Sequence, residues 1–171
     1  MTYKGAPMKS ERQDWGTPQS FIDWLEGAFE ELTLDAAASD TNHKAPKWFT
    51  AEQNGLDQSW ANEVVWVNPP FGKGGASLSS WAAKCAKERK RAKAIFLLIP
   101  ARTETRYWHD SIFPFAHRIY FIKGRFQFVH GDACEGANAP FPSALIEYRP
   151  YYHYESCKVV PLELTPKIRG F

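Results

Sequence analysis

The four residues Asn68-Pro69-Pro70-Phe71 bring an amide, two rigid carbonyls and an aromatic ring into one short turn. They follow the apolar run Val64-Val65-Trp66-Val67, whose β-branched and aromatic residues predict a buried strand. Because neither proline can donate a backbone hydrogen bond, we expect the strand to stop at Asn68. The polar turn would then lie at the carboxyl end of a strand, which is where open α/β sheets bind ligands.

This turn suits the methylation of an exocyclic amine. Such an amine is a poor nucleophile, because its lone pair is delocalised into the ring. The side-chain oxygen of Asn68 and the carbonyl of Pro69 can both accept its N–H protons, which stabilises the positive charge that grows on nitrogen during attack. Phe71 would stack on the face of the base, and the prolines would hold the geometry. A plain surface turn after a core strand is the alternative, and the motif alone leaves both open.

Length and charge limit the possible classes. A chain of 171 residues is enough for one domain with a sizeable core. The net charge of +2 is small, so any contact with DNA must come from a local patch. The sequence has no apolar run of about 18 residues and no signal-like start, which predicts a cytoplasmic protein outside the membrane.

Cysteine and histidine spacing offers one possible metal site. His130 and Cys134 are four residues apart, and so are His153 and Cys157. Neither pair contains a Cys-x-x-Cys, so a zinc site is not favoured and we expect no metal. An odd number of cysteines without that motif is typical of a reducing compartment.

The first half of the chain is expected to position the turn through one helix and one short strand. Apolar residues at helical spacing predict a helix over 18–31, with Thr17 as its N-cap and Pro18 at its first position. A short strand then ends at Asp35, and the small residues after it allow a ligand to approach the backbone closely. The spacing from Asp35 to Asn68 leaves room for at most one crossover helix.

The second half predicts a helix and three further strands. In the helix, Trp81 and Cys85 face inward. Arg102 and Arg106 follow a buried strand and are expected to share one helix face, where they could clamp a phosphate. The segment 129–142 is expected to be a loop. The remaining expectations are a helix over 77–92 with Lys84, Lys87, Arg89, Lys90 and Arg91 facing solvent, and strands over 94–99, 118–122 and 143–148.

These elements predict an α/β fold with a trimmed, Rossmann-like doubly wound sheet. The strand of Asp35 should lie beside the strand of Asn68, so that their carboxyl ends adjoin. We expect a flexible arm over 1–14, the main domain over 15–150, and an extension over 151–171 packed on the same domain. The sequence leaves the oligomeric state open, with a monomer favoured.

Five blocks occur in an order that resembles the phage-type (Dam-like) DNA N6-adenine methyltransferase family. They span about residues 14–150, and the ordered set is more specific than any block alone. The resemblance implies the fold of S-adenosylmethionine-dependent methyltransferases, S-adenosylmethionine as methyl donor, and adenine in DNA as acceptor, in the cytoplasm of a bacterial host. The blocks are Trp15-Gly16-Thr17-Pro18-Gln19, Leu34-Asp35-Ala36-Ala37-Ala38-Ser39, Asn68-Pro69-Pro70-Phe71, Pro100-Ala101-Arg102-Thr103-Glu104-Thr105-Arg106-Tyr107-Trp108 and Pro140-Phe141-Pro142-Ser143-Ala144-Leu145.

The same resemblance implies roles for individual residues. Asn68, Pro69, Pro70 and Phe71 take the catalytic positions. The family's glycine-rich donor loop is here Ala-Ala-Ala-Ser, and alanine restricts the left-handed conformations that glycine allows. Asp40 and Glu52 are the candidates for an acid that holds the donor's ribose. The donor-binding positions are Trp15, Thr17, Pro18, Asp35, Ala37, Ser39, Asn54 and Leu56, and the candidates for DNA phosphates are Lys73, Arg102, Arg106, Lys123 and Arg125.

Other functions remain open at this stage. The acceptor could be the N4 amine of cytosine or a glutamine amide of a protein, since Asn-Pro-Pro-Phe suits these amines too. A non-catalytic DNA-binding module with the same fold is a further alternative, which the complete Asn68–Phe71 turn argues against. A plain α/β protein with a chance motif is disfavoured by the five ordered blocks.

Overall fold

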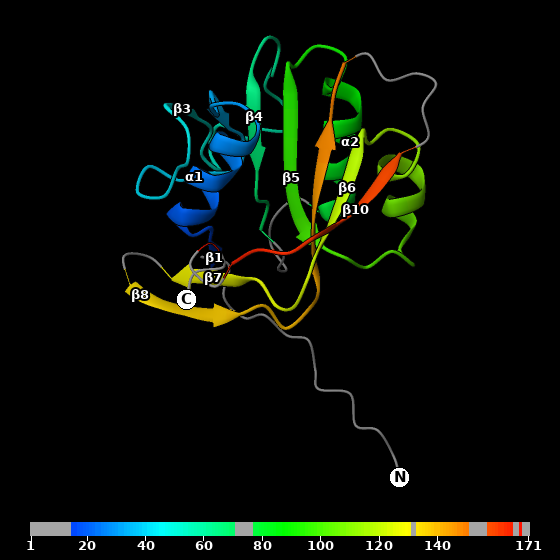
Figure 1. The fold of residues 1–171 in the computed structure, drawn as a ribbon. Coiled ribbons are helices and arrows are strands. Elements are labelled where there is room, and N and C mark those ends of the chain that lie inside the picture. Colours follow the sequence, from blue (N-terminus) through cyan, green and yellow to red (C-terminus); the bar gives the residue numbers. More distant parts are fainter. Residues whose placement is uncertain (1–14, 71–76, 131–132, 151–156, 166–167, 169–171) are drawn as a thin grey trace.

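A seven-stranded mixed sheet forms the centre of the computed structural model, which describes residues 15–70, 77–130, 133–150, 157–165 and 168 (Figure 1). Its strands are β2 (Leu34–Asp35), β3 (Lys47–Trp48), β4 (Val64–Val67), β5 (Ala94–Pro100), β6 (Arg118–Ile122), β9 (Ser143–Tyr148) and β10 (Lys158–Leu162). Their order across the sheet is β10-β6-β9-β5-β4-β2-β3.

The order of the strands reverses between β2 and β4. The chain passes from β2 outward to β3 and then returns to β4 on the other side of β2, and all three run parallel to β5. β9 is antiparallel and lies between β5 and β6, while β10 adds a parallel edge strand to β6. The predicted α/β class is confirmed, and the sheet is consistent with the fold of S-adenosylmethionine-dependent methyltransferases. The fold is trimmed in its helices: the described residues between β2 and β4 contain no crossover helix.

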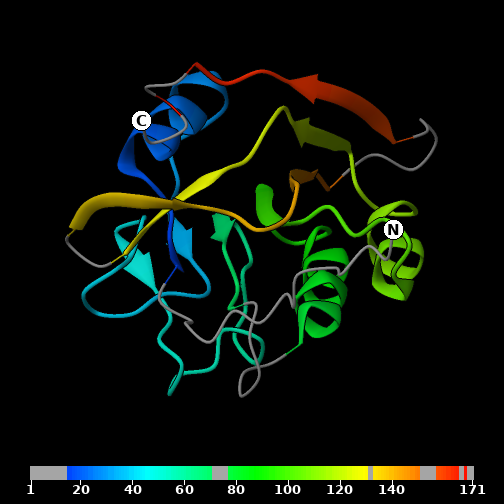
Figure 2. The same cartoon turned by 90° about the horizontal axis from the view of Figure 1, so that it is seen from below.

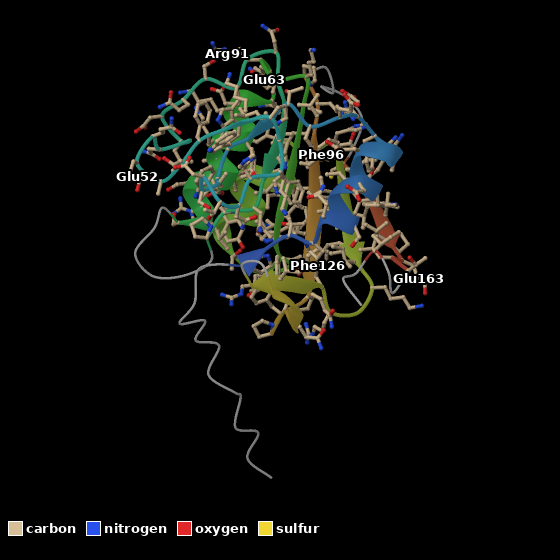
Figure 3. The ribbon with its side chains drawn as sticks, turned by 90° about the vertical axis from the view of Figure 1, so that its left-hand side faces the viewer. Glu52, Glu63, Arg91, Phe96, Phe126 and Glu163 are labelled. Carbon is tan, nitrogen blue, oxygen red and sulfur yellow. The ribbon has the colours of Figure 1, made fainter. Side chains whose placement is uncertain are left out.

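Two helices cover opposite faces of the sheet, α1 (Gln19–Ala28) and α2 (Leu78–Glu88) (Figures 1 and 3). Successive side chains of a strand point to opposite faces, so Val65 and Val67 pack in the cluster that contains α2, and Trp66 packs in the cluster that contains α1. A short π-helix, η1 (Trp108–Ile112), lies beside α2. No described helix is long and apolar enough to span a bilayer.

A small second sheet crosses the carboxyl edge of the large one (Figures 1 and 2). It pairs β1 (Trp15–Gly16) with β7 (Gln127–His130), which in turn pairs with β8 (Ala133–Asn138). The expected loop over 129–142 is therefore wrong, because this segment contains the end of β7 and the whole of β8. Phe126 and Phe128 are fully buried and anchor the hairpin in the cluster that contains α1.

The two predicted helices are present but shorter than expected, and Thr17 is not an N-cap. Pro18 occupies the cap position of α1 without a side-chain cap, and the helix ends at Ala28. In α2, Lys84 does not face solvent as predicted: its ammonium donates to the carbonyl of Gln58 at 2.7 Å and pairs with buried Glu88 at 3.3 Å. Burial of that carboxylate draws the lysine inward, since a buried charge requires a partner.

Arg102 and Arg106 do not share a helix face. The backbone N–H of Arg102 donates to the Pro100 carbonyl at 2.9 Å, and the Arg102 carbonyl accepts from the hydroxyl of Thr105 at 2.7 Å. This turn keeps Arg102 outside the helical segment that contains Arg106. Regular helix is not available directly after Pro100, because the strand still pairs there and Ala101 donates to the Pro142 carbonyl at 2.8 Å.

Candidate active site at the carboxyl edge of the sheet

The turns that follow β2 and β4 lie side by side. Asp35 is in register with Trp66, and the N–H of Ala36 donates to the Trp66 carbonyl at 3.0 Å. Neighbouring strands are about 4.8 Å apart. The small-residue turn after Asp35 and the turn that begins at Asn68 therefore leave the sheet at adjacent points, where the strand order reverses and α/β proteins bind their ligands.

Asp35 shapes the turn that follows it. One carboxylate oxygen accepts from the N–H of Ala37 at 3.2 Å, and the other accepts from the N–H of Lys44 at 3.0 Å. The side chain is buried, and this loss of solvation raises the pKa of Asp35 to about 6, although the two backbone hydrogen bonds and the nearby Lys44 charge act against the rise. Asp35 thus holds both ends of the segment 36–44.

Further backbone hydrogen bonds hold this segment against β3. The N–H of Ala38 donates to the Phe49 carbonyl at 3.0 Å, and Phe49 donates to the Asp35 carbonyl at 2.9 Å. Ala37 is half-buried beside these bonds. Ser39 is exposed and closes a tight turn, in which its hydroxyl accepts from the N–H of Asn42 at 3.1 Å.

Residues 54–56 pack directly on the turn after β2. A Cβ atom at Gly55 would lie 2.0 Å from the Ala36 carbonyl oxygen, so only glycine fits at this position. Buried Trp60 fixes the other side of Gly55 by donating from its indole to the Gly55 carbonyl at 3.0 Å. Asn54 adopts a positive φ of 49° and Leu56 packs on the core. Both residues were predicted to bind the donor, and they flank Gly55, which contacts Ala36.

Trp81 contributes a polar atom to the same neighbourhood. Its ring would contact a Cβ at Gly55 at 3.4 Å, and its indole nitrogen is buried with no hydrogen-bond partner among the described residues. A buried N–H without a partner is costly, and a bound ligand can satisfy it. The site thus combines small residues with a buried acid and this indole. Such a lining fits a ligand that is largely apolar and carries a few polar atoms, as a nucleoside does.

Asn68 contacts a residue from the start of the chain. Its side-chain nitrogen donates to the hydroxyl oxygen of Thr17 at 3.2 Å. The alternation of β4 explains the contact, because Asn68 continues the face of Val64 and Trp66, on which α1 packs. Pro18 and Pro69 are both buried next to this contact in the chain. The structure thus unites Thr17 and Asn68, two residues that the sequence assigned to separate tasks.

The two candidates for a ribose-binding acid differ in their surroundings. Asp40 accepts a hydrogen bond from the indole of Trp48 at 3.1 Å. Glu52 follows β3 and points outward at the edge of the molecule (Figure 3). The pKa of Glu52 is lowered because its carboxylate accepts a hydrogen bond from its own backbone N–H and a second one from the Thr50 side chain. Both acids lie on the side of the sheet edge that carries the turn after β2.

Three of the basic residues predicted to contact DNA follow strands that end at this edge of the sheet. Arg102 follows β5, and Lys123 and Arg125 follow β6. Lys123 pairs with Glu163 at 2.8 Å and Arg106 pairs with Asp110 at 2.9 Å, in each case on the surface. Surface ion pairs contribute only about 0–1 kcal/mol to stability. Little free energy is therefore lost if a phosphate group replaces the carboxylate as the partner of Lys123 or Arg106.

Several predicted residues lie outside the described part of the chain. These are Phe71 and Lys73, and His153 of the metal hypothesis. Within the described residues, no group of three or more His, Cys, Asp and Glu side chains is arranged to hold a metal ion.

Comparison with known proteins identifies the family. The family model for DNA N-6-adenine-methyltransferase (Dam) matches residues 4–160. The chain belongs to this family. A DNA N-6-adenine-methyltransferase of Escherichia phage T1 is 32% identical over 111 residues, which are 64% of this chain and 45% of the phage protein. A protein of the same name from Haemophilus phage HP1 (strain HP1c1) is 24% identical over 160 residues, 92% of this chain and 91% of that protein.

Family membership confirms the resemblance seen in the sequence, which rested on the five ordered blocks. The matched region contains every donor-binding and catalytic residue predicted above. The Gly55 packing and the Thr17–Asn68 contact were missed. Gly55 carried a signal, since a glycine between Asn54 and Leu56 indicates a close approach of two backbones. The contact of Thr17 with Asn68 had no such signal in the sequence, because a threonine before a proline predicts a helix cap.

Substituting Gly55 tests how the turn after β2 is packed. We expect Gly55→Ala to lower the free energy of unfolding by about 1–3 kcal/mol, because the new methyl group overlaps the Ala36 carbonyl. Urea denaturation measures this loss. Gly27→Ala in α1 is the matched control, since nothing lies within 4 Å of its Cβ position and alanine favours helix. Equal stability of both variants would contradict the packing described here.

The raised pKa of Asp35 predicts a pH-dependent stability. The folded protein binds this proton more tightly than the unfolded chain, in which the pKa is near 3.8. The resulting contribution is therefore fully present below pH 3.8 and is lost as the pH rises through about 6. Relative to Asp35→Asn, the wild type should lose up to about 3 kcal/mol between pH 4 and pH 7. Denaturant titrations of both proteins across this range measure the difference, and a constant difference would refute it.

Proposed function

We propose that this protein transfers a methyl group from S-adenosylmethionine to the N6 amine of adenine in DNA. The observation that carries the proposal is the pairing of β2 with β4, which brings the turn after Asp35 beside the turn that begins at Asn68. In a member of the Dam family, these turns are suited to hold the donor and the acceptor respectively. Residues 36–39 and 54–56 would bind the donor, and Asn68–Phe71 would bind the target base.

Asn68 and Pro69 act on the amine in this proposal. When bound, S-adenosylmethionine supplies an electrophilic methyl group, and a C–N bond forms as the C–S bond breaks and its electron pair stays on sulfur. The Asn68 side-chain oxygen and the Pro69 carbonyl accept hydrogen bonds from the two N–H groups of the amine, which directs the nitrogen lone pair at the methyl carbon and stabilises the charge that develops. The amine then loses its extra proton to water, so no strong base is needed before attack.

The target base must leave the double helix to reach this turn. A base in a stacked duplex presents only its edges in the grooves, so its amine cannot meet both acceptors of the turn and the donor at once. Phe71 is proposed to stack on the extruded base. Lys73, Arg102, Arg106, Lys123 and Arg125 are proposed to hold the flanking phosphates, and contacts of this kind position DNA without reading its sequence.

Replacing Asn68 tests the catalytic assignment. Asn68→Ala removes one of the two acceptors of the amine protons, and we expect kcat to fall at least about 100-fold while the Kd for S-adenosylmethionine stays within about twofold. Digestion of the treated DNA followed by nucleoside mass spectrometry measures N6-methyladenine and also detects N4-methylcytosine. Wild-type rates in the variant would refute the assigned role. Methylcytosine as the main product of the wild-type protein would refute adenine as the acceptor.

Arg125 tests the phosphate contacts. The exposed side chain follows β6 at the site edge, and its loss should weaken binding of duplex DNA equally for different sequences. We expect Arg125→Ala to reduce the slope of log Kd against log salt concentration by about 0.9. Lys93→Ala is the control, because Lys93 is also exposed but precedes β5 at the opposite edge of the sheet. Identical slopes in the two variants would exclude Arg125 from the DNA contact.

A further inference from the structure

Thr17 occupies a position that its place in the sequence does not explain. It lies one residue before the cap of α1, yet α1 has no side-chain cap and the Thr17 side chain is not used there. Instead the Thr17 hydroxyl oxygen accepts a hydrogen bond from the Asn68 amide nitrogen at 3.2 Å. Thr17 is only 2% exposed, so this bond lies in a region from which water is largely excluded.

An asparagine amide needs such a contact to be useful in catalysis. Its terminal torsion is broad and roughly two-fold, so a free amide samples orientations in which oxygen and nitrogen exchange places. Only the oxygen can accept a hydrogen bond from an amine. A partner that holds the nitrogen therefore determines where the oxygen points.

We propose that Thr17 is a positioning residue for the transfer, because its hydroxyl oxygen holds the nitrogen end of the Asn68 amide and thereby presents the oxygen end to the target amine. The proposal depends on the catalytic role proposed above for Asn68. It differs from the role that the family resemblance implies for Thr17, which is a contact with the donor.

The surroundings of Thr17 leave it little freedom to move. Before it, Gly16 pairs with Val129 of β7, and a Cβ at Gly16 would lie 3.1 Å from the Val129 side chain and 3.3 Å from that of Asn42. After it, Pro18 has a restricted φ and its carbonyl accepts the first hydrogen bonds of α1. The β-branched side chain of Thr17 is itself stiff at χ1. A hydroxyl fixed on both sides in this way can orient an amide without a large entropic cost.

The decisive comparison is between Thr17→Val and Thr17→Ser. Valine keeps the shape of threonine and removes the hydroxyl, so we expect kcat to fall about 10-fold to 100-fold, as small misplacements of reacting groups do. The Kd for S-adenosylmethionine, measured by calorimetry, should stay within about twofold. Serine keeps the hydroxyl and should restore kcat to within about threefold of the wild type. A Thr17→Val variant with unchanged kcat overturns the proposal, and so does one that loses donor affinity in proportion to its activity.

Combining substitutions separates this proposal from the catalytic role of Asn68. In an Asn68→Ala background the amide is already absent, so adding Thr17→Val should cause no further loss of kcat. A further loss equal to that of the single variant shows that Thr17 acts independently of Asn68 and overturns the proposal. Full activity of Asn68→Ala alone refutes the function proposed for that residue, which is a different result.

Thr33→Val is the control for the loss of a hydrogen-bonded threonine hydroxyl, at a half-buried position. The Thr33 hydroxyl donates to Glu63 at 2.6 Å and accepts from the N–H of Val64 at 2.9 Å, at the amino end of β4. Glu63 lies at the opposite end of the molecule from Phe126 (Figure 3). This variant should be less stable but keep kcat within about twofold at temperatures well below its Tm. If Thr17→Val unfolds near the assay temperature, Thr17→Ala provides the same comparison, and wild-type kcat in that variant overturns the proposal.

Discussion

The parallel pairing of β2 with β4 is the constraint on which the site depends. A single register, with Asp35 opposite Trp66, fixes where both turns leave the sheet. The excursion through β3 makes this pairing possible, since it carries the chain to the far side of β2 before it returns to β4. A shift of the register by one residue would reverse the faces of β4 and would direct Asn68 away from α1 and Thr17. The geometry of the candidate site is thus set by backbone pairing before any of its side chains is placed.

Three local features near this pairing lower the stability of the folded protein. A carboxylate is buried at Asp35, Asn54 has a positive φ, and the indole nitrogen of Trp81 has no partner among the described residues. All three lie in or beside the segments that are proposed to hold the donor. The two large apolar clusters on either side of the sheet supply the stability that tolerates them. Departures of this kind concentrate at functional sites, because a site shaped for a ligand is not shaped for its own lowest energy.

The strongest local signals in the sequence predicted the core strands, because continuous apolar runs such as 94–99 and 143–148 suit a strand buried on both faces. Non-local features were not predictable in this way. Residues 133–138 contain two alanines and a glycine, which have little strand propensity, and they form β8 only because β7 pairs with them. Family membership followed from five ordered blocks, and the adjacency of the Asp35 and Asn68 strands followed from their spacing and from the rule for α/β sheets. The contact of Thr17 with Asn68 joins residues 51 positions apart and has no local trace.

The antiparallel pairing of β1 with β7 has a consequence for synthesis on the ribosome. Residues 15–16 leave the exit tunnel more than 110 residues before their partners at 129–130, which emerge only after most strands of the large sheet have been made. Thr17 therefore cannot reach its final position while translation is at an early stage, and closing so long a loop is slow because the chain entropy is lost before the contacts form. Nascent chains that already contain the Asn68 turn therefore lack the Thr17 contact until residues 129–130 have emerged.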